Sequence, residues 1–143
     1  MNRIKLLLYF TIYNEISKIL NDIQGIEHCF LLIGKKNLDE VLIFNYTILT
    51  NTNCSDNSFE VPFYEIERII QSPQNKNCMF IFCHSHPSGN RFASELDKEF
   101  MKVLKIPWAI FTVDKENKLQ ITYYADSQKV PIEVTIFQGS YKI

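Results

Sequence analysis

Two histidines and an aspartate have the residue types and the spacing that metal chemistry requires. Residues 84–87 read His-Ser-His-Pro and follow the apolar run 78–83, which predicts a buried strand. If this strand continues to His86, its period-two alternation places the imidazoles of His84 and His86 on one face. Pro87 cannot donate a hydrogen bond to a neighbouring strand, so we expect the strand to end there.

Ser94 and Asp97 stand at the start of the next helical pattern, three residues apart, and therefore share a helix face. Folding this helix over the strand end would bring two imidazoles, a carboxylate and a hydroxyl to one point. The same pair also fits a helix capping box with Asp in place of the usual Glu. Without the histidines the capping interpretation would be preferred. With them, Asp97 is favoured as a third ligand, and Ser94 can both cap the helix and serve the site.

Two histidines and one aspartate form a ligand set that suits zinc. Structural zinc sites usually close with four protein ligands, whereas catalytic sites use three and keep a position for water. Neutral imidazole and carboxylate bind zinc at about 2.0–2.2 Å. Such an ion lowers the pKa of its bound water to roughly 7. The sequence therefore predicts one zinc ion per chain, held by His84, His86 and Asp97.

The pattern His84-x-His86-Pro87, six residues, then Ser94-x-x-Asp97 resembles the signature of the JAMM (MPN+/JAB) zinc metallopeptidases. That family also uses an upstream glutamate as general base, and the segment 27–34, in which Glu27 precedes an apolar run ending in glycine, resembles that part of the family. Two departures are present. Ala93 stands where family members often have proline, and Phe30 stands where they often have glycine. Neither departure removes a ligand.

Glu27 is one of several glutamates that could act as the base. The chemistry needs such a group, because something must take the proton from water and return it to the leaving amine. Glu27 directly precedes a long buried strand, which can carry its carboxylate to the sheet end near the metal. Acidic residues at strand starts are, however, usually just solvated. The competing candidates are Glu15, Glu40, Glu60, Glu65 and Glu67.

The resemblance implies a mixed α/β fold of the cytidine-deaminase-like kind, with a central mixed sheet flanked by helices. It implies that Glu27 acts as general base and that the Ser94 hydroxyl steadies the oxyanion. It also implies hydrolysis of a peptide or isopeptide bond after the C-terminal tail of a ubiquitin-like protein, with the tail beside residues 55–61. No insertion separates Leu104 from the strand at Trp108, which resembles the compact prokaryotic type. Members of that type process ubiquitin-like proteins or occur in anti-phage conjugation systems.

Two alternative functions are a non-catalytic scaffold and a zinc deaminase. Some JAMM relatives lose the ligands and serve as scaffolds or protein-binding modules, and the intact ligand set argues against that role here. A zinc deaminase needs His-x-Glu followed by Pro-Cys-x-x-Cys, and the sequence has no such pair. Cys83 precedes a ligand but would point to the opposite strand face, which disfavours a thiolate nucleophile. His28 is more simply structural.

Composition limits the remaining possibilities. A chain of 143 residues with 46% hydrophobic residues is most simply one domain spanning 1–143. The net charge of −1 gives no global field for nucleic acid. The four cysteines lack C-x-x-C pairing and predict free thiols in a reducing, cytoplasmic compartment. No signal peptide or transmembrane helix is expected.

Hydrophobic periodicity predicts strands and helices that interleave, as in a mixed sheet covered by helices. The expected strands are 4–10, 29–33, 41–50, 108–113, 119–124 and 130–137, with a short extended segment at 58–61. Three helices are expected. The first starts at the N-cap Thr11 and ends at Gly25, the second has Pro62 as its first residue, and the third follows Ser94. Residues 34–37 are expected to form a hairpin turn, and residues 51–57 a mobile loop.

Overall fold

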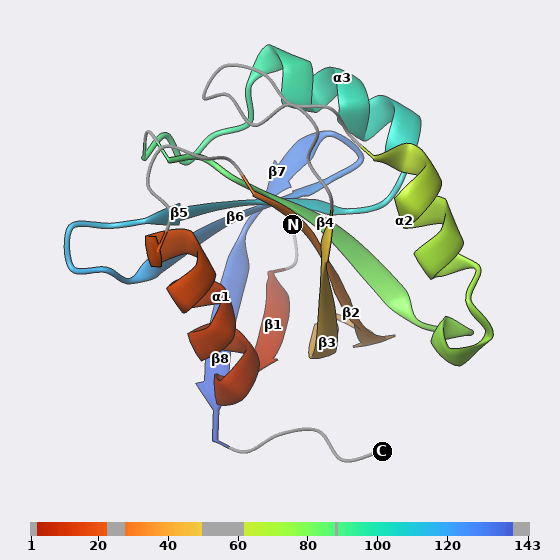
Figure 1. Cartoon of the computed structure of the whole chain (residues 1–143), viewed down its shortest axis with the longest axis horizontal. Coiled ribbons are helices and arrows are strands. Elements are labelled where there is room, and N and C mark those ends of the chain that lie inside the picture. The colour runs from red at the N-terminus through yellow and green to blue at the C-terminus, as the bar shows by residue number, and fades with distance from the viewer. Residues whose placement is uncertain (1–2, 23–27, 50–61, 88, 139–143) are drawn as a thin grey trace.

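The chain folds around one eight-stranded mixed sheet. The computed structural model describes residues 3–22, 28–49, 62–87 and 89–138. The strands are β1 (Ile4–Tyr9), β2 (Cys29–Asn37), β3 (Glu40–Leu49), β4 (Met79–Ser85), β5 (Trp108–Val113), β6 (Leu119–Ala125), β7 (Gln128–Val130) and β8 (Ile132–Phe137). The helices in the described residues are α1 (Phe10–Asp22), α2 (Phe63–Ile70), the short 3₁₀ helix η1 (Pro73–Asn75) and α3 (Glu95–Leu104). The strand order is β7-β6-β5-β4-β2-β3-β1-β8, and the sheet is strongly twisted (Figure 1).

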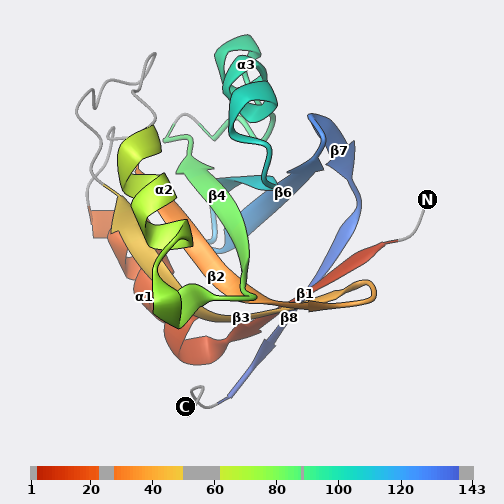
Figure 2. The ribbon, with the colours of Figure 1, turned by 90° about the vertical axis from the view of Figure 1, so that its right-hand side faces the viewer.

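The helices cover the two faces of the sheet unequally. Helix α1 packs on one face, and helices α2 and α3 lie on the other (Figures 1 and 2). Each helix presents an apolar stripe, as Ile12 and Ile16 of α1 show by their spacing of four. Ile66 of α2 and Met101 of α3 belong to the second core. We call these two sides the α1 face and the α3 face.

Strand β4 carries the site and lies in the middle of the sheet. It pairs antiparallel with β2 and parallel with β5, so that His84 lies between Cys29 and Ile110. Its side chains alternate between the two cores: Phe80 and Phe82 face α3, whereas Ile81 and Cys83 face α1. Burial on both faces explains the continuous apolar run 78–83. The sequence-based expectations of a mixed sheet and of a buried strand here are confirmed.

The turn expected at residues 34–37 is wrong, because β2 continues through Asn37. The hairpin turn is formed instead by Leu38 and Asp39, with Leu38 at a φ of 58°. Gly34 suggested a turn, but it lies inside the strand, where the register with β3 shifts between Ile33 and Gly34. An isolated glycine in a strand commonly marks such a bulge or a close backbone approach.

Replacing Gly34 with alanine is expected to destabilise the protein by about 1–3 kcal/mol, the usual cost of overpacking. A Cβ atom at this position would collide with the backbone carbonyl oxygen of Leu42, which cannot swing aside as a flexible side chain would. Urea denaturation measures the change in free energy of unfolding. Lys35→Ala, at an exposed neighbouring position, is the control and is expected to change little. Equal stability of Gly34→Ala and the wild type would contradict the close approach.

Several element boundaries also differ from those expected. Helix α1 begins at Phe10, so Thr11 lies inside the helix and is not its N-cap. Pro62 precedes α2 as its N-cap residue and is not the first helical residue. The expected strand 130–137 is divided by Pro131, which has no N–H to donate and separates β7 from β8. The predictions for Gly25 and for residues 51–61 lie outside the described residues.

Two further expectations concern the cysteines and the membrane. Cys29, Cys78 and Cys83 are free thiols, as predicted, whereas Cys54 lies outside the described residues. Within the described parts of the chain, no helix combines the length and the apolar character needed to cross a bilayer.

Candidate metal centre

The carboxyl end of β4 positions the two histidines. His84 is the penultimate residue of the strand, and His86 follows directly after its last residue, Ser85. The backbone N–H of His86 still donates to the carbonyl oxygen of Phe111 in β5, at 3.0 Å. His86 therefore keeps the direction of the strand, and both imidazoles lie on the α3 face. His84 is 1% exposed and His86 is 9% exposed.

The first turn of α3 positions Asp97. Ser94 is the N-cap: its Oγ accepts a hydrogen bond from the Asp97 N–H at 3.0 Å. The Asp97 Oδ2 accepts one from the Ser94 N–H at 2.8 Å, which completes a capping box. The capping interpretation is therefore confirmed, and the same aspartate also contacts both histidines. Asp97 is fully buried.

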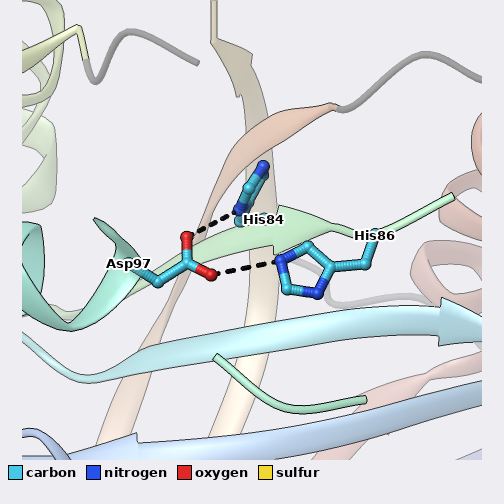
Figure 3. A group of neighbouring side chains, drawn as sticks. All are labelled: His84, His86 and Asp97. Carbon is cyan, nitrogen blue, oxygen red and sulfur yellow. Dashed lines mark hydrogen bonds and ion pairs between the residues drawn. The ribbon is translucent and has the colours of Figure 1, made fainter. Parts of the chain in front are cut away.

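Asp97 bridges the two imidazoles with its two carboxylate oxygens (Figure 3). Oδ1 lies 3.1 Å from Nδ1 of His84, and Oδ2 lies 3.1 Å from Nε2 of His86. The two rings are nearly perpendicular, at 89°, with their centroids 4.9 Å apart. One potential ligand atom from each of the three residues lies within 4.8 Å of the others, so this buried group could hold a metal ion.

The hydrogen bond from His86 to Asn90 determines which nitrogen of the His86 ring carries the proton and which carries the lone pair. Nδ1 lies 2.8 Å from the carbonyl oxygen of Asn90. A carbonyl can only accept, so Nδ1 is the donor. In a neutral ring Nε2 then carries the lone pair, and it faces Oδ2 of Asp97, which is also an acceptor. Such a pair requires a cation, either a second proton on the ring or a metal ion, and the set of two imidazoles and a carboxylate fits a metal.

The environment of Asp97 keeps its carboxylate charged. Burial alone would raise its pKa, because the ionised form loses hydration. Hydrogen bonds with the rings of His84 and His86, the charge of His84 and the backbone N–H of Ser94 outweigh burial and hold the pKa well below its usual range. A buried carboxylate that stays ionised needs cationic partners. The centre is therefore built around a fixed negative charge.

Ser85 and His28 join β4 to the start of β2 beside the centre. The Ser85 Oγ accepts a hydrogen bond from the His28 N–H at 2.7 Å, and the Ser85 N–H donates to the His28 carbonyl oxygen at 2.9 Å. Burial lowers the pKa of the His28 imidazole. The sequence pattern assigned Ser85 no role, because alternation places it on the strand face opposite the two imidazoles. The general-base candidate Glu27 lies outside the described residues.

Asn90 and Tyr124 also contact the centre or its loop and were not predicted. Asn90 acts through its backbone carbonyl, which no side-chain pattern could reveal. Tyr124 of β6 accepts a hydrogen bond at its hydroxyl from the N–H of Ala93, at 2.9 Å. Because Tyr124 follows Ser94 by 30 residues in the chain, no local sequence pattern connects the two.

The expectation for Cys83 is confirmed, and Trp108 nearby is part of the core. Cys83 is fully buried on the α1 face, away from Asp97, and burial raises the pKa of its thiol. A thiol with a raised pKa is a poor nucleophile. Trp108 is fully buried in the core of the α3 face and packs against Phe82 at 4.4 Å between ring centroids. It is a core residue and not a substrate platform.

A cavity of about 690 Å³ lies on the same face but at another place. Residues of β2, β3, α2 and η1 line it, including Ile33, Phe44 and Arg68. In the pairing of β2 with β4, Cys29 lies at one end as the partner of His84, and Ile33 lies near the other end. None of His84, His86 and Asp97 lines this cavity, so the cavity and the metal centre are separate features.

Comparison with known proteins supports the fold. No protein-family model and no curated protein matches the chain. The chain is similar to protein DSY2949 from Desulfitobacterium hafniense, whose structure was determined in solution, with a TM-score of 0.71 and 17% sequence identity. The alignment covers 93% of this chain and 94% of that protein. At this identity the likeness shows the fold alone. The chain therefore shares a mixed α+β architecture with a protein of known structure over nearly its whole length.

Proposed function

We propose that the protein is a zinc-dependent hydrolase that cleaves a peptide or isopeptide bond. The single observation that carries this proposal is the position of the buried Asp97 carboxylate between the imidazoles of His84 and His86. Burying a carboxylate costs free energy unless a cation lies beside it. A catalytically silent scaffold would have no need to keep all three groups.

Zinc suits this donor set better than the harder cations. Imidazole nitrogen is a preferred ligand of zinc, whereas magnesium and calcium prefer oxygen alone. Three protein ligands are typical of catalytic zinc sites. When bound, zinc would supply Lewis acidity here, which lowers the pKa of a water molecule and polarises a carbonyl group.

Glu27 is the proposed general base and then general acid. Glu27 precedes Cys29 by two residues, and Cys29 is the cross-strand partner of His84. As a carboxylate, Glu27 has the chemistry to take a proton from water and return it to the leaving amine.

Ser94 is the proposed oxyanion donor. Its Oγ uses a lone pair to accept from the N–H of Asp97, so the hydroxyl proton can still be donated to another oxygen. Ser94 is exposed, although it directly contacts the buried Asp97. A donor at the rim of the centre could reach a carbonyl oxygen that develops negative charge.

The substrate class rests on the resemblance to the JAMM metallopeptidases. We propose that the substrate is a ubiquitin-like protein or its conjugate, which is cut directly after its C-terminal tail in deconjugation or in precursor processing. Residues 55–61, proposed to lie beside this tail, fall outside the described residues.

The zinc-loaded protein is expected to cleave fusions of ubiquitin-like proteins encoded near its gene, directly after the C-terminal tail. Mass spectrometry of the products gives the bond that is cut. Chelation of the metal and the variant His86→Ala are both expected to abolish cleavage. Cleavage that survives both treatments would indicate a contaminating protease and count against the proposal, as would intact fusions throughout the panel.

A further inference from the structure

We infer that Tyr124 is a positioning residue of the metal centre, which holds the loop between β4 and α3 against the sheet. We call residues 89–94 the anchor loop. The inference rests on the centre described above and deepens the proposed function, because it names a residue outside the ligand set that fixes the ligands.

The anchor loop contacts the centre at two points. At one end the Asn90 carbonyl oxygen accepts a hydrogen bond from Nδ1 of His86, at 2.8 Å. At the other end the Ser94 N–H donates to Oδ2 of Asp97, at 2.8 Å. The first contact selects the nitrogen that His86 presents, and the second orients the carboxylate. The position of this loop therefore determines the geometry of two of the three proposed ligands.

Tyr124 fixes the loop between these two points. Its hydroxyl accepts a hydrogen bond from the N–H of Ala93, the residue directly before Ser94, at 2.9 Å. Tyr124 is 5% exposed and belongs to the hydrophobic core of the α3 face. It lies on β6, which is separated from β4 by β5 in the sheet. The loop is thus held by a part of the sheet that is distant from it in sequence.

A second contact joins the same loop to the neighbouring strand. The ammonium group of Lys129 in β7 lies 4.9 Å from the ring centroid of Phe92. This cation–π contact is exposed, which keeps its contribution small. The two contacts follow one another along the loop, at Phe92 and Ala93, and both lead to the strands at the β7 edge of the sheet.

The hydrogen bond also gives a physical role to the residue type at position 93. Proline has no N–H, so it could not donate to Tyr124. Proline would restrict the loop through its ring, whereas alanine permits the hydrogen bond from the loop to Tyr124 of β6. In this chain the hydroxyl of Tyr124 supplies the restraint at this position.

Tyr124→Phe tests the inference, since it removes the hydroxyl and retains the ring. In the metal-free protein, we expect faster hydrogen exchange of the Ala93 amide. Zinc affinity, measured by competition with a chromophoric chelator, is expected to fall about three- to tenfold, as for the loss of one neutral hydrogen bond. Tyr123→Phe is the matched control: Tyr123 is 3% exposed and packs on the α1 face. It is expected to leave both measurements unchanged.

Ala93→Pro completes the test by removing the donor in place of the acceptor. If the hydroxyl acts through Ala93, adding Tyr124→Phe to Ala93→Pro produces no further loss of zinc affinity. A full further loss in the double variant overturns the inference, as does unchanged Ala93 exchange in Tyr124→Phe. A wild-type protein that binds no zinc refutes the proposed function instead, and the exchange measurement still decides whether Tyr124 holds the loop.

Discussion

Asp97→Asn is expected to abolish stoichiometric zinc binding and, with it, hydrolysis. Both oxygens of Asp97 face imidazole nitrogens at 3.1 Å. The asparagine side chain has the same shape, but it carries no negative charge and presents an amide nitrogen to one ring. Loss of a partner outside the ligand set commonly lowers metal affinity 10–100-fold, so we expect loss of this ligand to exceed about a hundredfold. Titration of the metal-free protein with zinc measures the change.

Asp126→Asn is the matched control for this variant. Asp126 is an exposed residue in the β6–β7 turn with a φ of 52°, a conformation that asparagine tolerates. It is expected to bind zinc as the wild type does. Circular dichroism must show that Asp97→Asn remains folded. A folded Asp97→Asn that binds one zinc ion with wild-type affinity would show that the carboxylate is not a ligand.

Glu27→Gln is expected to lower kcat by about two to four orders of magnitude while zinc remains bound. This is the usual contribution of a positioned general base. Glutamine keeps the size and polarity of the side chain but cannot take a proton from water. Steady-state kinetics on the cleaved fusion, with metal analysis of the same sample, separates this effect from loss of the metal.

Glu40→Gln is the control for the base assignment. Glu40 is an exposed glutamate at the start of β3, where it pairs with Asn37. It is expected to retain full activity. Near-normal turnover in Glu27→Gln, together with a large loss in another of the glutamates considered as candidates, would move the role of the base to that residue.

Local sequence patterns predicted the parts of the site that depend on one element each. Alternation along a continuous apolar run placed His84 and His86 on one face of β4. The spacing of Ser94 and Asp97 placed both at the first turn of a helix, where they form the capping box. These features follow from backbone periodicity, which short stretches of sequence encode directly.

Contacts between distant segments could not be predicted in the same way. The hydrogen bond between Ala93 and Tyr124 depends on the strand order, and that order is set by packing of the whole chain. The extension of β2 past Gly34 was missed for a related reason. Glycine and the polar residues after it have the composition of a turn, and only the pairing with Leu42 and its neighbours shows a bulged strand.

Zinc K-edge X-ray absorption of the zinc-loaded protein tests the central claim most directly. The claim is that His84, His86 and Asp97 together hold one metal ion. We predict one zinc ion per chain, a first shell of nitrogen and oxygen at about 2.0–2.2 Å, and multiple scattering from two imidazoles. A sulfur shell at about 2.3 Å, a single imidazole, or a folded protein that retains no zinc would contradict the claim.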